Sequence, residues 1–160
     1  MGFPLNDIGA FVKAYDGNAS EGAADIPSII TAGAALDNVK STGQGINRKN
    51  GTALAHSAVV ATGWLASLAD TKTLSLAHEV QYSSDNSSFD TAVVIEAATV
   101  KVTATAAAAT YRGVSEHDLN LMAQKQYLRI NTTLDLSAAN TDIAIYFTIV
   151  MLGGWTQIPQ

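Results

Sequence analysis

The sequence predicts an all-β protein, an antiparallel β-sandwich of jelly-roll type with an extended N-terminal arm. Two observations carry this prediction. After residue 50, apolar residues recur at every second position, which is the period of a half-buried strand. The five or six strands predicted in this way are separated by short polar turns, and no long amphipathic helix interrupts them. Regularly spaced short strands of this kind are typical of a sandwich.

Residues 1–50 are predicted to form a largely irregular arm with one or two strands, and residues 51–160 to form the jelly-roll domain. The first 50 residues are rich in Gly, Asn, Asp and Ala and show no sustained period. Two short apolar pairs, Phe11-Val12 and Ile29-Ile30, are suited to docking on a neighbouring subunit. The arm is therefore expected to reach a partner and to become ordered there.

Between residues 73 and 105 the pattern predicts two strands and one turn. In the first strand, residues 73–82, the apolar face also carries His78, which we expect to be a hydrogen-bonded core histidine. The segment 83–88, Ser-Ser-Asp-Asn-Ser-Ser, is a polar turn. In the second strand, residues 91–105, the apolar residues change parity near Ala97-Ala98, which predicts a bulge, a corner or a tight turn at that point.

The two C-terminal strands are predicted over residues 125–136 and 142–152. The second is apolar on both faces, so we expect it to be central in its sheet or to lie in a subunit contact. Gly153-Gly154 ends it. From the parity of all these strands we predict the following core residues: Leu74, Leu76, Val80, Leu128, Ile130, Ile145 and Phe147.

Two alanine-rich segments remain ambiguous on sequence alone. Residues 53–69 contain enough alanine for a helix, but Val59, Val60, Thr62 and Gly63 favour a strand. Residues 104–109 are compatible with a helical turn or with a flat strand.

Composition excludes several classes of protein. The chain has 160 residues and no cysteine, which excludes a disulfide scaffold, a zinc finger of the cysteine type and a thiol enzyme. A net charge of −5 argues against a nucleic-acid partner. Only 14% of the residues are charged, which favours a surface covered by partners. The first residues lack a basic segment followed by an apolar one, so no signal peptide is expected, and no run reaches the roughly 20 apolar residues of a membrane helix.

No residue pattern predicts catalysis, a cofactor or a metal. His56 precedes Ser57 without the glycines of a nucleophile elbow. His117-Asp118 fits a polar loop or the start of a helix, and no histidine has a partner at metal-ligand spacing in the sequence. The basic residues Arg48-Lys49, together with Lys40, are expected to form a solvated loop. We therefore expect no enzyme activity, no cofactor and no small-molecule substrate.

Two segments resemble small virion proteins of tailed phages. The first runs from Ser57 through Thr73-Leu74-Ser75-Leu76 to the sequence Val-Gln-Tyr-Ser-Ser-Asp-Asn-Ser-Ser-Phe, which ends at Phe89. The second contains Gln-Tyr-Leu-Arg-Ile at 126–130 and an apolar strand that closes on Leu-Gly-Gly-Trp at 152–155. Together they resemble the jelly-roll capsid cement, or decoration, proteins. This resemblance covers roughly residues 55–158 and implies no catalytic residues.

The resemblance implies a structural virion protein that binds the outside of a phage capsid across capsomer joints and stabilises the shell. The outside is favoured because an acidic chain is repelled by packaged DNA. Expected partners are the major capsid protein and further copies of the chain, as a dimer or trimer, with no nucleic acid and no membrane. The protein would be located in the virion after assembly in the host cytoplasm. The alternatives are a phage neck, tail or vertex protein and, in another class, a ligand- or carbohydrate-binding β-sandwich. Six residues are predicted to contact partners: Phe11, Val12, Ile29, Ile30, Tyr146 and Trp155.

Overall fold

The computed structural model describes residues 13–16, 28–33, 36–50, 53–106, 109–137 and 141–154, with the backbone alone described for residues 13–16, 28, 29 and 50. These residues form short strands in the N-terminal third and long strands after it. The short ones are β1 (Lys13–Asp16), β2 (Ser28–Thr31), β3 (Val39–Thr42), β4 (Ile46–Asn47), β5 (Lys49–Asn50) and β6 (Ala53–Leu54). The long ones are β7 (Ser57–Leu68), β8 (Thr73–Ser83), β9 (Val93–Thr103), β10 (Ala109–Asn120), β11 (Tyr127–Leu136) and β12 (Ile143–Gly153).

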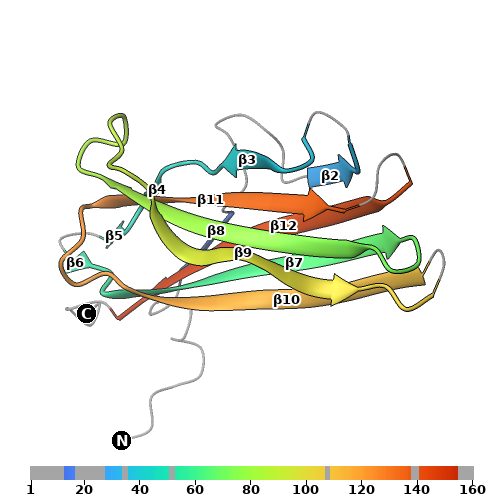
Figure 1. The fold of residues 1–160 in the computed structure, drawn as a ribbon. Coiled ribbons are helices and arrows are strands. Elements are labelled where there is room, and N and C mark those ends of the chain that lie inside the picture. The colour runs from blue at the N-terminus through green and yellow to red at the C-terminus, as the bar shows by residue number, and fades with distance from the viewer. Residues whose placement is uncertain are drawn as a thin grey trace, which may run out of the picture.

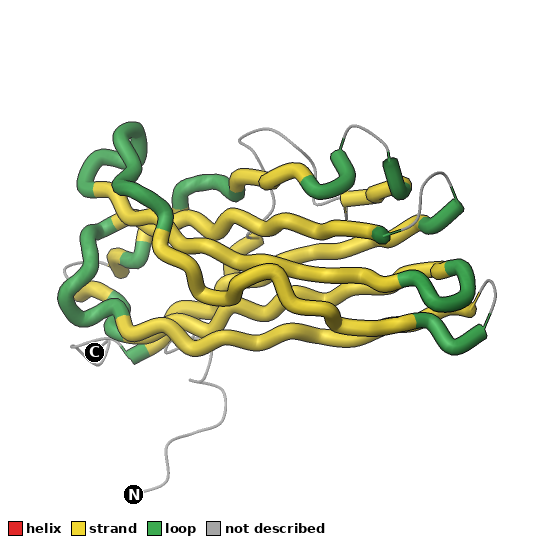
Figure 2. The backbone as a smooth tube through the Cα atoms, viewed as in Figure 1, coloured by secondary structure: helices red, strands yellow, loops and turns green. Residues whose placement is uncertain are grey.

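The strands form two antiparallel sheets that face each other (Figure 1). Sheet A has the order β1-β12-β7-β10, with β2 also pairing with β12. Sheet B has the order β3-β11-β8-β9, with β4 also pairing with β11. Strands β5 and β6 pair separately. Figure 2 shows that strands and loops account for the described backbone, in which no helix occurs. The described residues thus hold no helix that is long and apolar enough to cross a membrane.

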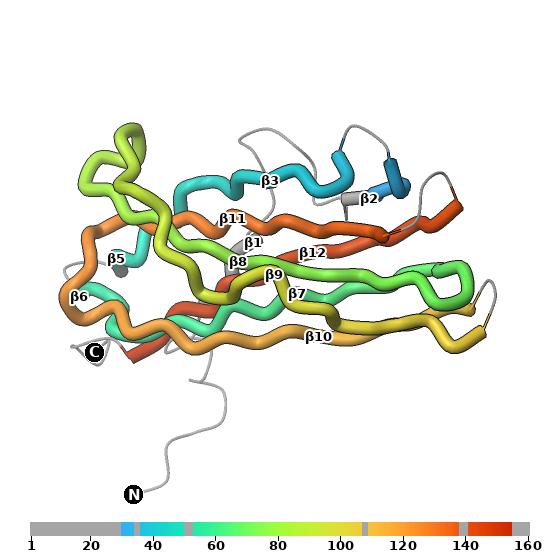
Figure 3. Tube along the Cα trace, in the orientation of Figure 1, coloured from blue at the N-terminus to red at the C-terminus, as the bar shows by residue number. Residues whose placement is uncertain are grey.

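The strand pairing is nested in the manner of a jelly roll. Strand β7 pairs with β10 and β8 pairs with β9, and these inner pairs are enclosed by the pairing of β3 and β4 with β11 and of β1 and β2 with β12. The chain therefore crosses repeatedly between the two sheets, and its course can be traced in Figure 3 from blue at the N-terminus to red at the C-terminus. The predicted antiparallel β-sandwich of jelly-roll type is confirmed.

Residues 1–50 contribute more strands than the sequence pattern predicts. Strands β1 and β2 extend sheet A beside β12, and β3 and β4 extend sheet B beside β11. Each of these strands has two to four residues, which is too short to show a period in the sequence. Strands β1 to β4 thus lie along one edge of each sheet.

One of the two ambiguous alanine-rich segments, residues 53–69, is resolved into strands; of the other, residues 104–106 lie outside the strands, Ala109 begins β10, and residues 107 and 108 lie outside the described residues. Residues 57–68 form strand β7, which is central in sheet A and pairs with β12 and β10 on its two sides.

Strand β9 has register irregularities against β8, and one of them lies between the pairs Leu76–Thr99 and His78–Glu96. The residues left out of register there are Ala97 and Ala98, so the irregularity predicted at this point is confirmed, and of the three predicted alternatives it is a bulge. It places Glu96 directly opposite His78.

The core consists of two hydrophobic clusters between the sheets. The first includes Leu74, Leu76 and Tyr146, and the second includes Val80, Leu128 and Ile130. Five of the seven predicted core residues are confirmed by these clusters. The prediction for Ile145 and Phe147 is wrong.

The even-numbered residues of strand β12, and not the odd-numbered ones, point into the core. Its buried residues are Ala144, Tyr146, Thr148, Val150 and Leu152. Because both faces of β12 are apolar, its own alternation does not determine which face enters the core. Its central position in sheet A, between β7 and the pair β1 and β2, confirms one of the two predictions for this strand.

A buried arginine closes one end of the sandwich. The Arg48 side chain is 1% exposed, and its guanidinium donates hydrogen bonds to four backbone carbonyls, those of Ala55, Leu121, Gln124 and Lys125. Burial lowers the pKa of Arg48, with a smaller opposing effect from Tyr82. The expectation that Arg48 lies in a solvated loop is therefore wrong: its guanidinium is buried and donates to backbone carbonyls from separate segments of the chain.

Candidate functional site: an apolar face and a polar belt

Sheet A presents apolar side chains to solvent on its outer side. Five of them form a continuous group that we call the apolar face: Leu65, Val114, Ile143, Ile145 and Phe147. Val114 is 63% exposed and Phe147 is 46% exposed, although both sit on long, regular strands. Isolated exposed apolar residues are ordinary in proteins, but a contiguous group is typical of a contact surface.

The register of three neighbouring strands brings these residues together. Leu65 on β7 lies opposite Ile145 on β12, and Gly63 lies opposite both Phe147 and Val114. A Cβ atom at Gly63 would lie 2.5 Å from the Phe147 ring. The ring therefore lies over the glycine, and an open groove is lined by the residues around it.

The rim of the apolar face is polar. Arg112 on β10 lies opposite Leu65, and farther along the same strand Glu116 and Asp118 are exposed. At the other end of β10, Thr110 lies opposite Ser67. An apolar centre with an arginine and a polar rim is the usual composition of a protein–protein interface.

Inside the sandwich, a chain of polar side chains crosses the core. We call it the polar belt, and it takes one residue from each of the six long strands: Thr132, Thr148, Thr62, His78, Glu96 and His117. The belt separates the two hydrophobic clusters. On β8, for example, Leu74 and Leu76 belong to one cluster, while Val80 and Tyr82 on the other side of His78 belong to the second.

Each neighbour in the belt is within hydrogen-bond distance. Starting at β11, the hydroxyl of Thr132 lies 3.3 Å from that of Thr148, which lies 2.9 Å from that of Thr62. Thr62 Oγ1 is 2.8 Å from Nε2 of His78. The opposite ring nitrogen of His78, Nδ1, is 3.2 Å from Oε2 of Glu96, and Nε2 of His117 is 3.0 Å from the same oxygen.

The charges in the belt determine the direction of its hydrogen bonds. Burial would raise the pKa of Glu96, but hydrogen bonds from Lys101 and His78 outweigh that effect and lower it. Glu96 is therefore ionised at neutral pH and only accepts, so Nδ1 of His78 and Nε2 of His117 both donate. Burial lowers the pKa of His78, which keeps the ring neutral. Its Nε2 then accepts from Thr62, which in turn accepts from Thr148.

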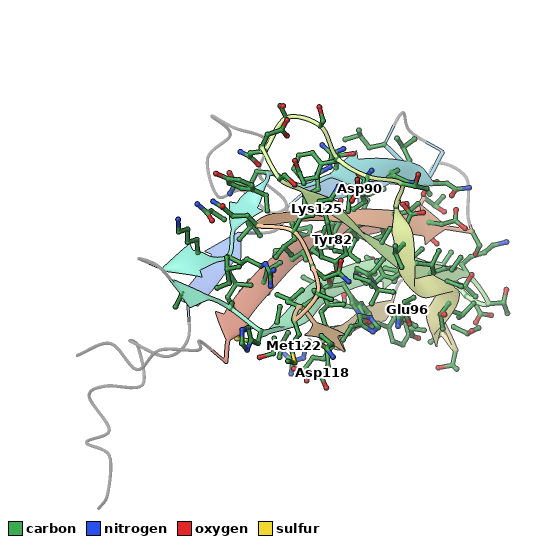
Figure 4. The ribbon with its side chains drawn as sticks, turned by 90° about the vertical axis from the view of Figure 1, so that its left-hand side faces the viewer. Tyr82, Asp90, Glu96, Asp118, Met122 and Lys125 are labelled. Atoms are coloured by element: carbon green, nitrogen blue, oxygen red, sulfur yellow. The ribbon has the colours of Figure 1, made fainter. Side chains whose placement is uncertain are left out.

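The charged end of the belt lies where the edges of the two sheets meet. Glu96 belongs to β9, the edge of sheet B, and His117 belongs to β10, the edge of sheet A. Figure 4 labels Glu96 beside β9. Lys101 contacts the second oxygen of this carboxylate, Oε1. The His78 side chain is fully buried, while those of Glu96 and His117 are 15% and 19% exposed. The expectation of a hydrogen-bonded core histidine at position 78 is confirmed.

None of the six residues predicted from the sequence to contact partners belongs to the apolar face as defined above. Ile30 and Tyr146 lie in the first hydrophobic cluster, at 3% and 2% exposure, where they contact the chain's own core. Ile29 lies in β2, opposite Ile145, and its side chain is not among those described. Phe11, Val12 and Trp155 lie outside the described residues. Partner contact for these six residues stays a prediction.

Sequence reasoning missed the histidine–glutamate cluster, and it indicated the apolar face only through the two apolar faces of β12. The cluster joins residues that are 18 and 21 positions apart in the chain, so no spacing rule for metal ligands or catalytic groups detects it. A signal for the belt was nevertheless present. His78 and Thr132 each interrupt an otherwise apolar inward face near the middle of a strand.

Comparison with known proteins supports the fold. No protein-family model matches the chain, and no curated protein matches it. Among solved structures, the chain is similar to a protein of the Gx strain of infectious bursal disease virus, with a TM-score of 0.51 and 9% identity over 88% of this chain and 32% of the other. A chain of the T13 particle of this icosahedral virus is similar with a TM-score of 0.51 and 10% identity, over 88% of this chain and 30% of the other. A chain of the VP2 subviral particle of infectious bursal disease virus is similar with a TM-score of 0.50 and 9% identity, over 88% of this chain and 32% of the other.

At this level of identity the likeness concerns the fold alone. The present chain spans about a third of the length of these viral chains. The shared fold is that of a protein found in assembled viral particles, as the names of these structures state.

Proposed function

We propose that the chain is a structural protein of a virus particle, and specifically a cement protein that binds the outside of a phage capsid across capsomer joints. The observation that carries the proposal is the apolar face of sheet A, on a fold shared with proteins of viral particles. Its partners are then the major capsid protein and further copies of the chain, as a dimer or trimer. The chain acts in the virion, after assembly in the host cytoplasm, and catalyses no reaction.

The composition of the apolar face supports this role. Val114, Phe147 and Leu65 supply apolar area at the centre, and Arg112 lies beside them. Apolar side chains at the centre of an interface contribute most of the binding free energy, while the rim mainly excludes water. On a capsid the same contact is repeated at every equivalent joint.

The proposed mechanism is energetic. A protein that binds only the assembled lattice stabilises that lattice by mass action. When one chain contacts two capsomers, the second contact forms at a high effective concentration, so modest individual affinities add up to firm attachment. The shell is then harder to rupture by heat or by internal pressure.

The test is binding of the purified chain to capsids that lack it. Val114→Asp places a carboxylate in the apolar face without changing the core. We expect this variant to sediment with capsids at least about tenfold more weakly than the unsubstituted chain, because a desolvated charge at the centre of an interface is costly. Val94→Asp is the matched control, since Val94 is 59% exposed on β9 of the other sheet.

Equal binding by both variants would exclude the apolar face as the contact. Capsids without the protein should also release DNA at a lower temperature than capsids that carry it. If the chain instead localises to the tail or neck of the particle, the tail or neck alternative replaces the cement proposal. Binding to a glycan array that Val114→Asp leaves intact would favour a carbohydrate-binding module.

A further inference from the structure

The charged end of the polar belt has the composition of a metal site. His78, Glu96 and His117 each offer one ligand atom, and these atoms all lie within 4.8 Å of one another. The two imidazole rings are tilted by 50°, with centroids 5.1 Å apart, so they do not stack. Their nitrogens converge on one carboxylate oxygen, Oε2 of Glu96.

Two of the three separations between these atoms are close to those of ligands around a tetrahedral ion. Metal–ligand distances of roughly 2.0–2.1 Å place tetrahedral ligands about 3.3–3.4 Å apart. The separations of Glu96 Oε2 from the His78 and His117 nitrogens are 3.2 Å and 3.0 Å. The third separation, between Nδ1 of His78 and Nε2 of His117, is at most 4.8 Å, so the two rings would move toward each other to admit the ion.

We propose that His78 Nδ1, Glu96 Oε2 and His117 Nε2 bind a divalent transition metal ion, with Zn²⁺ as the best match. Two imidazoles and one carboxylate suit Zn²⁺ and its neighbours in the first transition series, whereas Ca²⁺ and Mg²⁺ require oxygen ligands. Three protein ligands leave a fourth position for water or for a group from a partner. This proposal does not depend on the proposed function.

The surroundings of the three ligands support the site. A metal-binding histidine usually has its other nitrogen fixed by a second partner, and Thr62 Oγ1 lies 2.8 Å from Nε2 of His78. Lys101 contacts Oε1 of Glu96 and leaves Oε2 to the two histidines. His78 is fully buried and is therefore the ligand least accessible to water.

Metal binding changes which ring nitrogens of His78 and His117 carry protons. In the metal-free belt, Nδ1 of His78 and Nε2 of His117 carry the protons that bind Glu96. On binding, the ion takes the place of both protons, and each ring keeps its proton on the other nitrogen. The Nε2–H of His78 then donates to Thr62, the reverse of the metal-free direction. The ion would join β8 and β9 of sheet B to β10 of sheet A, where the sheet edges meet.

The experiment is a Zn²⁺ titration of the full chain by calorimetry, with thermal unfolding in parallel. We expect one ion per chain and a melting temperature that rises with Zn²⁺ concentration, with no such rise in Mg²⁺ or Ca²⁺. His117→Asn removes the most exposed ligand and should weaken Zn²⁺ binding at least about 100-fold, since even partners behind the ligands are worth 10–100-fold. His56→Asn is the matched control and should bind as the unsubstituted chain does.

Two further measurements keep the proposal testable if His117→Asn is destabilised. Co²⁺ bound to the unsubstituted chain should give the intense visible absorption of a four-coordinate site, and Zn²⁺ should displace it. Lys101→Met removes an ammonium next to the ion and should strengthen Zn²⁺ binding several-fold, because like charges repel in a partly buried site. Equal affinity of His117→Asn and the unsubstituted chain would overturn the proposal, as would the absence of one-to-one binding.

Discussion

The indole of Trp64 lies against the backbone of Gly113, its partner on the neighbouring strand. A Cβ atom at Gly113 would lie 2.5 Å from Cζ2 of the ring, which is closer than side chains approach one another. Trp64 is buried in the first hydrophobic cluster, so its ring is held by neighbours on its other sides. The glycine thus provides the space that a large core side chain occupies.

Gly113→Ala should lower the free energy of unfolding by about 1–3 kcal/mol, the usual effect of overpacking a core. Gly63→Ala is the matched comparison, because its added methyl meets the outer end of the Phe147 ring, which is half exposed and free to turn. It should change the free energy of unfolding by less than about 1 kcal/mol, because alanine loses less conformational entropy on folding than glycine does, which offsets part of the cost of moving the ring. Urea unfolding of both variants measures the difference, and equal losses would contradict this account.

Arg48→Met should lower the free energy of unfolding by at least about 3 kcal/mol. The substitution keeps much of the side-chain volume but removes the hydrogen bonds of the guanidinium to four carbonyls. The buried carbonyl of Ala55 loses the donor that the guanidinium supplied, and that of Leu121 keeps only the N–H of Gln124, and each buried group left unpaired costs about 1–3 kcal/mol. Lys49→Met, at the next position, is exposed and serves as the control. A small effect of Arg48→Met in urea unfolding would show that water replaces the guanidinium.

Stability should fall as the pH is lowered from 7.5 to 5.5. The pKa of His78 in the folded chain lies below its ordinary value of 6.5. The unfolded chain therefore binds more protons, and the stabilising effect of the neutral ring is present above pH 6.5 and lost below it. Glu96, whose pKa is also lowered, adds a loss of the same sign only below its ordinary value of 4.5.

The measurement is the melting temperature at several pH values in the presence of a chelator. In His78→Gln the fall between pH 7.5 and 5.5 should be smaller than in the unsubstituted chain, whereas His56→Gln should keep the full fall. An unchanged slope in His78→Gln would assign the pH dependence to other groups.

Thr62→Val should destabilise the chain by about 1–2 kcal/mol, more than Thr132→Val does. Thr62 occupies the middle of the belt, so its loss removes the hydrogen bond to Nε2 of His78 and the nearer of the two hydroxyl contacts of Thr148. Thr132 is the last member, and its contact to Thr148 is the longest of the series, at 3.3 Å. Valine has nearly the shape of threonine, so urea unfolding of the two variants compares the hydrogen bonds themselves.

Alternation of apolar and polar residues was sufficient to predict most of the sandwich. Strands such as β8 and β11 have one apolar and one polar row, and their inward residues, including Leu76 and Ile130, follow from the sequence. Strand β12 has two apolar rows. The inward row is fixed by features outside the strand, namely the contact of Thr148 with the belt and the space that Gly63 leaves for Phe147.

The candidate site was less accessible to sequence reasoning for a physical reason. Its residues meet only after the two sheets have packed, and Glu96 turns toward His78 because of the bulge at Ala97 and Ala98. An irregularity at this point, a bulge, a corner or a tight turn, was predicted from the change of parity in β9. Its consequence was not, because the partner strand of β9 cannot be deduced from β9 itself.

The polar belt has a consequence for how the strands align. Alternation opposes a strand slipping by one residue, since every side chain would change face. It does not oppose a slip by two residues, which only exchanges one inward apolar side chain for the next. In this chain such a slip of β8 would place Leu76 or Val80 against Thr62 and Glu96 and would move His78 into a hydrophobic cluster. A buried polar group without partners is costly. The belt therefore penalises even-numbered slips in all six long strands and makes one alignment of the jelly roll preferred over its neighbours.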